Sequence, residues 1–527
     1  MSIQRVLIAG QWCDADSSGT FSAENPATRE VLADEYPVST WSDCDRVLQA
    51  ASEAAAELRT MTGDQVASFL EDYATRIEQH ADELVEMAHQ ETALPKAPRL
   101  ADVELPRTTN QLRLGAAAAG NGSWAQATID TTAGIRSCFG PIGPVCVFGP
   151  NNFPFAFGSM SGGDFAAAIA AGNPVIAKAN SSHPGTTRIF AEAAQEASLA
   201  MDMPAATVQL LYRTSHDDGE RLVADPRIGA TGYTGSRNAG LKLKQAADAV
   251  GKPIYLELSS TNPVVILPGA LEERLDAIAD DFSGSCLMGA GQFCTNPGIV
   301  VLIAGDETEA FITAVAQRFE KAPVGTLLSK SVESNLQKNL STLRSAGAEL
   351  VVGDSDGQGT GYCRANTLLR VSGETFLANS EALQTEAFGN ASLFVVAAGI
   401  DEAARLLGQM EGNLTGCVYS HAGGKDDANY DLIAGPLRQR VGRLLNDKMP
   451  TGVAVSSAMN HGGPYPSTGH PGFTAVGMPG SLVRFAMLQS YDNVRPARLP
   501  PLLRDKNSTE ATWRLVDGQW TTADVDS

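Results

Sequence analysis

A cysteine and a glutamate stand in local sequences that can support covalent chemistry. Cys294 lies in the turn-rich segment 291–296, between an apolar helix-like stretch and a strand that starts near Gly298. Such a junction can expose a thiol, although a lone cysteine is more often a small buried hydrophobic residue. Glu257 interrupts the strand-like run 255–260, so its carboxyl group must be neutral, paired with a cation, or available as a general base beside a cavity. Position alone leaves the structural and the functional interpretation open for both residues.

Two further segments carry groups that can bind anions. Residues 148–154 lead from a strand end into a turn, where the amide of Asn152 can either donate to an oxyanion or stabilise the turn itself. The sequence GSRNAG begins at Gly235 after another strand-like run. It can approach a phosphate through its glycine backbone and the hydroxyl of Ser236. Gly235 and Gly240 alone are a weak signal.

Repeated strand-then-helix patterns place these segments at the ends of strands. Apolar runs that each precede a polar or glycine-rich turn occur at 145–148, 174–177, 208–211 and 228–231. Strands that alternate with helices predict a parallel, doubly wound sheet, in which ligands bind at the carboxyl ends of the strands. A second α/β block from about 261 to 463 carries its own strands at 263–267, 298–302 and 394–396. The turns of these blocks are therefore where we expect the chemistry.

The rest of the chain has the patterns of scaffold. Residues 5–38 alternate short apolar runs with turn-forming residues, which indicates strands joined by tight turns. From Asp64 to Ala88 apolar residues recur every three or four positions, which predicts one long amphipathic helix. The segment after about residue 493 is rich in proline and charge, so we expect it to wrap a surface or a partner subunit.

Composition and charge argue against several classes of function. The 527 residues suggest two to four domains, and 43% hydrophobic with 19% charged residues is typical of an ordinary α/β protein. A net charge of −21 without a basic run argues against nucleic acid and anionic membranes as partners. The eight cysteines and seven histidines show no framework or ligand spacing, so we expect reduced thiols and no metal. The lack of a long apolar stretch predicts a cytoplasmic protein.

Taken together and in this order, the segments resemble the aldehyde dehydrogenase superfamily over about residues 10 to 477. The motif that the family writes Pro-Trp-Asn-Phe-Pro corresponds to 150–154, Phe-Thr-Gly-Ser to 233–236, Glu-Leu-Gly-Gly to 257–260, Gly-Gln-x-Cys to 291–294 and Glu-x-Phe-Gly to 386–389. The resemblance implies that Cys294 attacks the aldehyde and that the Asn152 amide, with the Cys294 backbone N–H, holds the oxyanion. Glu257 would then activate the water that hydrolyses the thioester.

The same resemblance implies an NAD or NADP site. Lys178 matches the family lysine that contacts the adenosine ribose, Ser236 the residue at the pyrophosphate, and Glu386 the residue that holds the nicotinamide ribose. The residues expected to bind the cofactor are Lys178, Ser181, Gly235, Ser236, Gly240, Glu386 and Phe388. NAD-preferring relatives carry a glutamate where this chain has Ser181, so NADP should be tolerated or preferred, with Arg213 as a possible partner of its 2′-phosphate. Asn151 for the family tryptophan, and Ser259-Ser260 for the glycine pair, are departures close to the site.

The architecture implied by the resemblance has three parts. A Rossmann-like cofactor domain is expected over 1–258, interrupted by an oligomerisation hairpin near 124–138. A catalytic α/β domain is expected over 259–462. The C-terminal segment 463–527 is expected to contain an oligomerisation strand near 481–492. The family usually forms dimers or tetramers through these strands, so a homo-oligomer is expected here.

Three segments narrow the expected substrate. Residues 104–113, residues 153–164 and residues 461–468 look like those of α-ketoglutarate semialdehyde (2,5-dioxovalerate) dehydrogenases and of the related NADP-dependent fatty-aldehyde dehydrogenases, and the first group is the preferred interpretation. A substrate that ends in a carboxylate needs a cation, which Arg107 or Arg113 can supply unless each forms an ordinary salt bridge. Phe153 would form part of an apolar wall that suits a long aldehyde as well as a short one.

Two functions of other classes remain open at this point. A thiol hydrolase that needs no cofactor can use Cys294 and Glu257 to make and break an acyl-enzyme without hydride transfer. The glycine-containing turn at Gly235, together with Lys178 and Glu386, argues against it. A catalytically silent binding protein on the same fold is disfavoured by the intact set of cysteine, glutamate and asparagine.

Overall fold

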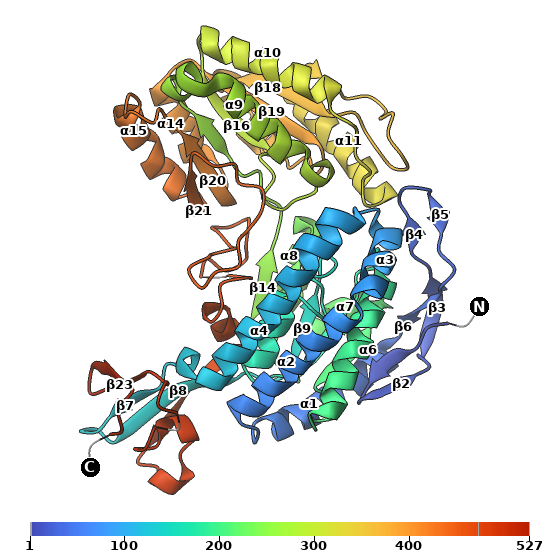
Figure 1. The fold of residues 1–527 in the computed structure, drawn as a ribbon, viewed down its shortest axis with the longest axis vertical. Helices are drawn as coiled ribbons and strands as arrows, with labels where there is room; N and C mark the ends of the chain where they lie inside the picture. Colours follow the sequence, from blue (N-terminus) through green and yellow to red (C-terminus); the bar gives the residue numbers. More distant parts are fainter. Residues whose placement is uncertain (1–2, 473, 508, 526–527) are drawn as a thin grey trace.

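Three β-sheets organise the molecule (Figure 1). The computed structural model describes residues 3–472, 474–507 and 509–525. Two seven-stranded, mainly parallel sheets lie one above the other, and a five-stranded sheet projects to the side near the C-terminus. This arrangement confirms the predicted fold class: a Rossmann-like parallel sheet, a second α/β unit and a small β element.

The first sheet has the strand order β14-β13-β9-β10-β11-β1-β2. Its parallel strands are β9 (Val145–Phe148), β10 (Val175–Lys178), β11 (Val208–Leu211), β13 (Ala230–Thr234) and β14 (Ile254–Glu257), with β1 (Val6–Ile8) and β2 (Gln11–Cys13) as an antiparallel edge. The chain leaves β9 for β10 on one side and later forms β13 on the other. Such a switch point opens a crevice at the carboxyl ends of the strands, where ligands bind.

Helices cover this sheet, so its central strands are continuous apolar runs; β11, for example, is buried throughout. The helices of this part are α1 (Trp41–Leu58), α2 (Gly63–Gln79), α3 (Ala81–Thr92), α4 (Leu105–Asn121), α5 (Gly163–Ala170), α6 (Pro184–Ala200), α7 (His216–Val223) and α8 (Arg237–Asp248), with the helical segment η1 (Lys96–Glu104) before α4. The prediction of one long helix from Asp64 is wrong. His80 leaves the helical conformation (φ −94°, ψ 14°) and separates α2 from α3, whereas the apolar spacing continues across the break.

Small sheets border the first sheet. They consist of β3 (Ser17–Phe21), β6 (Tyr36–Ser39) and β12 (Arg213–Thr214), and of β4 (Glu24–Asn25) with β5 (Glu30–Val31). The strands and turns predicted for the first forty residues are therefore present.

The second sheet has the strand order β17-β18-β19-β16-β15-β20-β21 and is parallel except for β17. Its strands are β15 (Val264–Ile266), β16 (Ile299–Ile303), β17 (Glu349–Val352), β18 (Thr367–Ser372), β19 (Ala391–Ala397), β20 (Asn413–Tyr419) and β21 (Val441–Asn446). Its helices are α9 (Pro268–Leu287), α10 (Asp306–Lys321), α11 (Lys330–Ser345), α12 (Gly373–Ala378), α13 (Ser380–Leu383), α14 (Ile400–Gln409) and α15 (Asp427–Arg438), with the short segment η3 (Met288–Gly291) after α9. Only residues 258–263 separate β14 from β15, so the carboxyl end of the first sheet leads directly into the start of the second.

The third sheet has the order β22-β8-β7-β23-β24. Its strands are β7 (Thr128–Asp130), β8 (Ile135–Pro141), β22 (Ala486–Asp492), β23 (Arg514–Val516) and β24 (Gln519–Thr521). The predicted hairpin and late strand are present, but the tail does more than wrap a surface, because β23 pairs with β7 and extends the sheet. Outer strand β22 is largely exposed, with Leu488 58% accessible; its role in an oligomer stays a prediction. Within the described part of the chain, no helix has the length and apolarity needed to cross a bilayer.

Candidate active site

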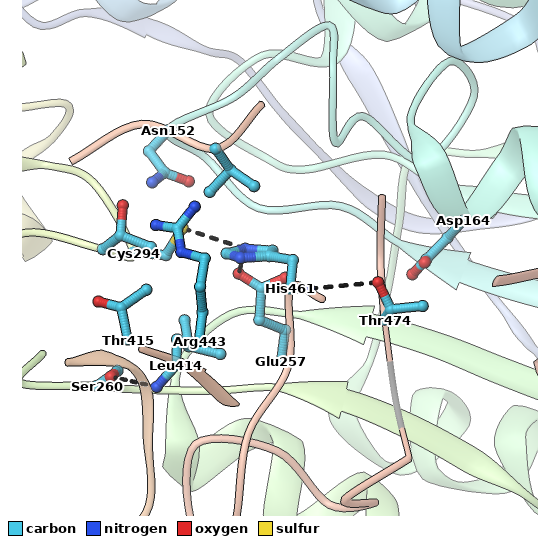
Figure 2. Close-up of polar contacts among 12 residues, drawn as sticks. Asn152, Asp164, Glu257, Ser260, Cys294, Leu414, Thr415, Arg443, His461 and Thr474 are labelled. Carbon is cyan, nitrogen blue, oxygen red and sulfur yellow. Dashed lines mark hydrogen bonds and ion pairs between the residues drawn. The ribbon is translucent and has the colours of Figure 1, made fainter. Parts of the chain in front are cut away.

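Three side chains from distant segments meet between the two large sheets (Figure 2). Glu257 is the last residue of β14, Cys294 lies between η3 and β16, and His461 lies in the loop that follows β21. The connection from β14 to β15 brings the carboxyl end of the first sheet beside the start of the second. Cys294 and Glu257 therefore lie close together, although no residue near either of them in the sequence indicates His461.

His461 contacts both of the other two side chains. Its Nε2 lies 3.4 Å from Cys294 Sγ and 2.8 Å from Glu257 Oε1. Glu257 is 2% and His461 is 1% exposed, so these contacts form where water does not weaken them. The ring of Phe157 packs against the imidazole, and the His461 backbone N–H donates to Thr474 Oγ1 (Figure 2). One nitrogen in contact with both groups can carry a proton between the thiol and the carboxylate.

The surroundings of Cys294 keep its thiol protonated. Burial raises the pKa of the Cys294 thiol well above its ordinary value. The negative charge of Glu257 and a hydrogen bond to it raise this pKa further, and the cation of Arg107 opposes them. Because the thiolate is the nucleophile, attack by Cys294 requires that a base take its proton. His461 and Glu257 are placed to do so.

Asn152 lies in the turn after β9 and is 7% exposed. Its Nδ2 donates to the carbonyl oxygen of Gln292 at 2.9 Å, which fixes the plane of the amide and leaves its second N–H for another acceptor. Arg99 donates to the backbone carbonyl of Asn152 at 3.0 Å, and the Glu104 carboxylate accepts two backbone N–H groups farther along the turn. The amide is thus held in a fixed orientation on the turn that borders Cys294 (Figure 2), as an oxyanion donor must be.

The two serines in place of the family glycines have hydrogen-bond partners. The Ser260 hydroxyl donates to Asn262 Oδ1 at 2.9 Å, and the Asn262 amide donates to the Cys294 carbonyl at 2.9 Å. The Ser259 hydroxyl and the Ser260 backbone N–H form hydrogen bonds with the Glu386 carboxylate. The serines therefore connect the segment that carries Glu257 to the nucleophile loop and to Glu386.

A cavity of about 740 Å³ runs from Cys294 along the carboxyl ends of the first sheet. Its size is typical of a ligand site. Among the residues expected from the sequence it is lined by Asn152, Lys178, Ser181, Gly235, Ser236, Glu257, Cys294, Glu386 and Phe388, and Arg213 also lines it. The structure thus gathers most of the expected cofactor residues and all three expected catalytic residues around one cavity.

Charged groups at two places in this cavity have shifted pKa values. Burial, reinforced by the nearby charge of Arg213, lowers the pKa of Lys178 to about 8. Burial raises the pKa of Glu386 to about 7, against the hydrogen bonds from the two serines. Between them, helix α8 begins directly after Ser236, and no side chain caps its first N–H groups. A cationic group, free helix N–H groups and a carboxylate match the ribose hydroxyls and phosphates of a dinucleotide.

Another part of the site, outside this cavity, is apolar and contains arginine. The ring of Phe153 packs edge-on against those of Phe157 and Phe293, with 5.3 Å between centroids in each pair. Arg107 lies over Phe157, and its Nη1 donates to the carbonyl of Val453 at 2.7 Å. The aromatic wall expected around Phe153 is present, and Arg107 adjoins it.

Two expected site residues lie elsewhere. Arg113 donates two hydrogen bonds to Glu78, at 2.6 and 2.9 Å, and so joins α4 to α2 through a partly exposed ion pair; its assignment as a substrate cation is wrong. Gly240 does not line the cavity. A Cβ there would lie 2.5 Å from Leu258 Cδ2, so the glycine lets α8 pack closely against Leu258; its role in cofactor binding stays a prediction.

The same three groups also form a possible metal-ligand set. One ligand atom from each of Glu257, Cys294 and His461 lies within 4.8 Å of the others, and thiolate, imidazole and carboxylate all bind zinc. Sequence spacing could not show this set because its members are far apart in the chain. The expectation that the protein uses no metal stays a prediction, which full activity after dialysis against a chelator would support.

Comparisons with known proteins agree with this geometry. The model of the Aldehyde dehydrogenase family matches residues 12–433. The chain is 38% identical over 531 residues to alpha-ketoglutaric semialdehyde dehydrogenase 2 of Azospirillum brasilense, covering 98% of this chain and 100% of the relative. It is 34% identical over 519 residues to alpha-ketoglutaric semialdehyde dehydrogenase of Acinetobacter baylyi, covering 94% and 96%.

Solved structures share the fold. A betaine aldehyde dehydrogenase of Staphylococcus aureus superposes with a TM-score of 0.79 at 20% identity, over 93% of this chain and 96% of that one. Aldehyde dehydrogenase C of Pseudomonas syringae, solved with NAD+ and octanal, gives 0.78 at 20% identity over 94% and 98%.

Proposed function

Because this chain belongs to the aldehyde dehydrogenase family, we propose that it oxidises α-ketoglutarate semialdehyde to 2-oxoglutarate with NADP or NAD as the oxidant. The family identity rests on a match that covers most of the chain. The observation that carries the proposed chemistry is the contact of one imidazole nitrogen with both the Cys294 thiol and the Glu257 carboxylate, at the border of the long cavity. Two curated relatives named for this semialdehyde support the choice of substrate.

Cys294 begins the reaction by attack on the aldehyde carbon. Its proton passes to His461 Nε2, which lies 3.4 Å from Cys294 Sγ. The new oxyanion accepts hydrogen bonds from the free N–H of the Asn152 amide and from the Cys294 backbone. The bound nicotinamide cofactor supplies the acceptor for the hydride that leaves the former aldehyde carbon. A thioester on Cys294 remains.

Hydrolysis of the thioester needs an activated water. After His461 has released the thiol proton to solvent, Glu257, directly or through His461, takes a proton from that water, and the hydroxide attacks the thioester carbonyl. The tetrahedral intermediate uses the same Asn152 donor, and the thiolate leaves with the acid as product. The proton returned to the thiol restores the neutral, half-buried Cys294 for the next cycle.

The cofactor contacts follow the cavity. Lys178 and Ser181 would lie at the adenosine ribose, the α8 N-terminus after Ser236 at the pyrophosphate, and Glu386 at the nicotinamide ribose. Ser181 presents no negative charge to a 2′-phosphate, and Arg213 lines the same cavity close enough to affect the Lys178 pKa. These features support the use of NADP beside NAD.

The experiment that tests this function is a set of steady-state measurements on the purified protein. The substrates are α-ketoglutarate semialdehyde, succinate semialdehyde and a long-chain aldehyde, each with NADP and with NAD. We expect the first substrate to give the highest kcat/KM and Cys294→Ala to abolish cofactor reduction. A clear preference for the long-chain aldehyde would favour a fatty-aldehyde dehydrogenase instead.

The Cys294–His461 contact also favours a second candidate, a thiol hydrolase that uses no cofactor. A thiol beside an imidazole can act as the nucleophile of a hydrolase. Here the thiol and the carboxylate both contact Nε2, whereas in a catalytic triad they contact opposite ring nitrogens, so the thiol–imidazole contact alone supports this candidate. Activated esters would distinguish the two functions. Ester hydrolysis faster than aldehyde oxidation, with no gain from added NADP or NAD, would replace the dehydrogenase proposal.

A further inference from the structure

A second arginine approaches Cys294 from the opposite sheet. Arg443 lies in β21 of the second sheet, whereas Arg107 lies in α4 beside the first. Figure 2 shows the Arg443 guanidinium beside the Cys294 side chain and across from Asn152. The charge of Cys294 influences the pKa of both arginines, which agrees with a position of each close to the sulfur. Sequence reasoning gave no role to Arg443.

The two arginines hold the same short loop. Arg443 Nη2 donates to the carbonyls of Pro450 and Gly452 at 3.0 and 3.3 Å. Arg107 Nη1 donates to the carbonyl of Val453 at 2.7 Å. Residues 450–453 thus separate the two guanidinium groups by only a few residues of backbone. Both groups are fixed by these contacts before any ligand arrives, so little side-chain entropy is lost on binding.

Each arginine keeps one buried N–H group without a partner. The unpartnered atoms are Arg107 Nη2 and Arg443 Nε. Among the described residues, the hydrogen-bond acceptors of Arg107 and Arg443 are neutral groups. By contrast, Arg99 forms an ion pair with Glu104, and Arg113 forms one with Glu78. Burial lowers the pKa of both Arg107 and Arg443. Buried N–H donors of a cation that lack an acceptor are costly, and a carboxylate would satisfy them.

The wall beside these donors is suited to a short chain of methylene groups. Val453 and Met459 pack with the buried cluster of Phe153, Phe157 and Phe293. Met459 also accepts from Arg443 Nη1 at 3.6 Å through its sulfur. The methylene groups of an aldehyde bound at Cys294 would therefore contact the apolar wall, and its far end would lie beside the two guanidinium groups.

We propose that Arg443 is a substrate-binding residue that, with Arg107, clamps the carboxylate of a short semialdehyde while its aldehyde carbon faces Cys294. The clamp would use Arg443 Nε from β21 and Arg107 Nη2 from α4. It selects substrates with an anionic end and binds none of the reacting atoms. The inference rests on the proposed function, because it gives the residue that recognises the far end of the same substrate.

The test compares charged and neutral aldehydes of similar length in matched variants of the full-length enzyme. The substrates are succinate semialdehyde with butanal, and α-ketoglutarate semialdehyde with pentanal. The variants are Arg443→Met, Arg443→Lys, and Arg113→Met as a control on an arginine that joins two surface helices. The measured quantity is the ratio of kcat/KM for the charged aldehyde to that for the neutral aldehyde.

In Arg443→Met we expect this ratio to fall by about 30-fold or more, because a desolvated charge-assisted bond is lost. Oxidation of pentanal should fall by less than about threefold, since no carboxylate is involved. Arg443→Lys should retain part of the ratio, and Arg113→Met should keep the wild-type ratio. If the ratio is unchanged in Arg443→Met, including the case in which both aldehydes lose activity equally, the proposal is wrong. Arg443 would then support the loop 450–453 or the Cys294 thiol and would not bind the substrate carboxylate.

A second measurement does not depend on turnover. Glutarate should protect wild-type Cys294 from iodoacetamide, and this protection should be lost in Arg443→Met and retained in Arg113→Met; protection that persists in Arg443→Met overturns the clamp. The proposed function is judged separately by the wild-type preference among aldehydes. If the wild type prefers long neutral aldehydes, the proposed function is wrong. The ratio of kcat/KM for charged and neutral aldehydes would still test the role of Arg443.

Discussion

The cofactor cavity and the surroundings of the nucleophile are built in different ways. The cavity takes most of its side chains from the carboxyl ends of the first-sheet strands and the turns that follow them, as with Lys178 at the end of β10 and Ser236 after β13. Glu386 adds a group from the second α/β unit. The nucleophile is surrounded by residues from both sheets and from a late loop, among them His461, Arg107 and Arg443. The turns that follow the strands of a parallel sheet all lie at the carboxyl ends of those strands, so local sequence places the residues that line the cavity there. The residues around Cys294 come together only because the two sheets pack against each other.

This difference indicates which residues of such a fold can be substituted without loss of the cofactor cavity. Under the proposed function the cavity groups would bind parts of a cofactor that does not vary with the substrate, and most of them are placed by the strand ends of the first sheet. The loop after β21 carries His461 and the 450–453 segment, and loops tolerate change more readily than strands. Changes in this loop would therefore alter the surroundings of Cys294 while the turns of the first sheet keep their positions.

The largest expected effect separates the two catalytic steps. Glu257→Gln should still give a single-turnover burst of reduced cofactor, while steady turnover falls by about 10² or more, because the base for hydrolysis is lost. Stopped-flow absorbance of the reduced cofactor measures both phases. A burst that disappears while the cofactor still binds would show that Glu257 is needed before hydride transfer.

His461→Ala sharpens the same comparison. If His461 Nε2 takes the thiol proton, this variant should slow the burst itself by about 10², which Glu257→Gln does not do. Phe157 packs on the imidazole, so cofactor binding serves as the check on the folded site. An unchanged burst rate would assign proton transfer in the first step to Glu257 alone.

The comparison also explains which parts of the site could be predicted from the sequence. Glu257 ends β14 and Asn152 follows β9, so local patterning placed both residues near strand ends, and the resemblance to the family implied their roles. His461 and Arg443 reach Cys294 only through the packing of the second sheet against the first, and no local pattern encodes that contact. Arg113 was assigned wrongly because helix spacing does not show whether an arginine faces a cavity or a neighbouring helix.

In the cofactor cavity, Ser181→Glu tests the next-largest effect. A carboxylate at this position would repel the 2′-phosphate of NADP and accept from the ribose hydroxyls of NAD. We expect KM for NADP to rise by about tenfold or more, with little change or a gain for NAD. Ser182→Glu, in the same turn and also lining the cavity, is the positional control. Unchanged NADP kinetics in Ser181→Glu would place the phosphate elsewhere.

The raised pKa of Cys294 predicts a smaller effect, on alkylation. The free thiol should react slowly with iodoacetamide at pH 7, and the rate should rise with pH without a plateau below about pH 9. Glu257→Gln removes a negative charge that raises the thiol pKa, so it should speed alkylation at pH 7 by roughly three- to tenfold. A plateau near neutral pH in the wild type would mean that the resting enzyme already holds a thiolate.

The smallest expected effect is a fraction of a proton, measured at the far end of the cofactor cavity from the thiol. Lys178 has a pKa of about 8 in the free protein because burial and Arg213 disfavour its cation. At pH 8 about half of the molecules therefore carry a neutral Lys178. A 2′-phosphate has released its second proton well below this pH, and its negative charge raises the lysine pKa, so binding NADP should take up as much as about half a proton. NAD has no such phosphate, so its binding should take up a smaller fraction of a proton.

Calorimetry in buffers of different ionisation enthalpy measures this proton uptake directly. Lys178→Arg is the matched variant, because arginine is charged at every pH used; it should bind NADP with no proton uptake from this position. Equal uptake for NADP and NAD would mean that the 2′-phosphate does not change the Lys178 pKa, and that the charge of Arg213 and the absence of a carboxylate at Ser181 set cofactor choice.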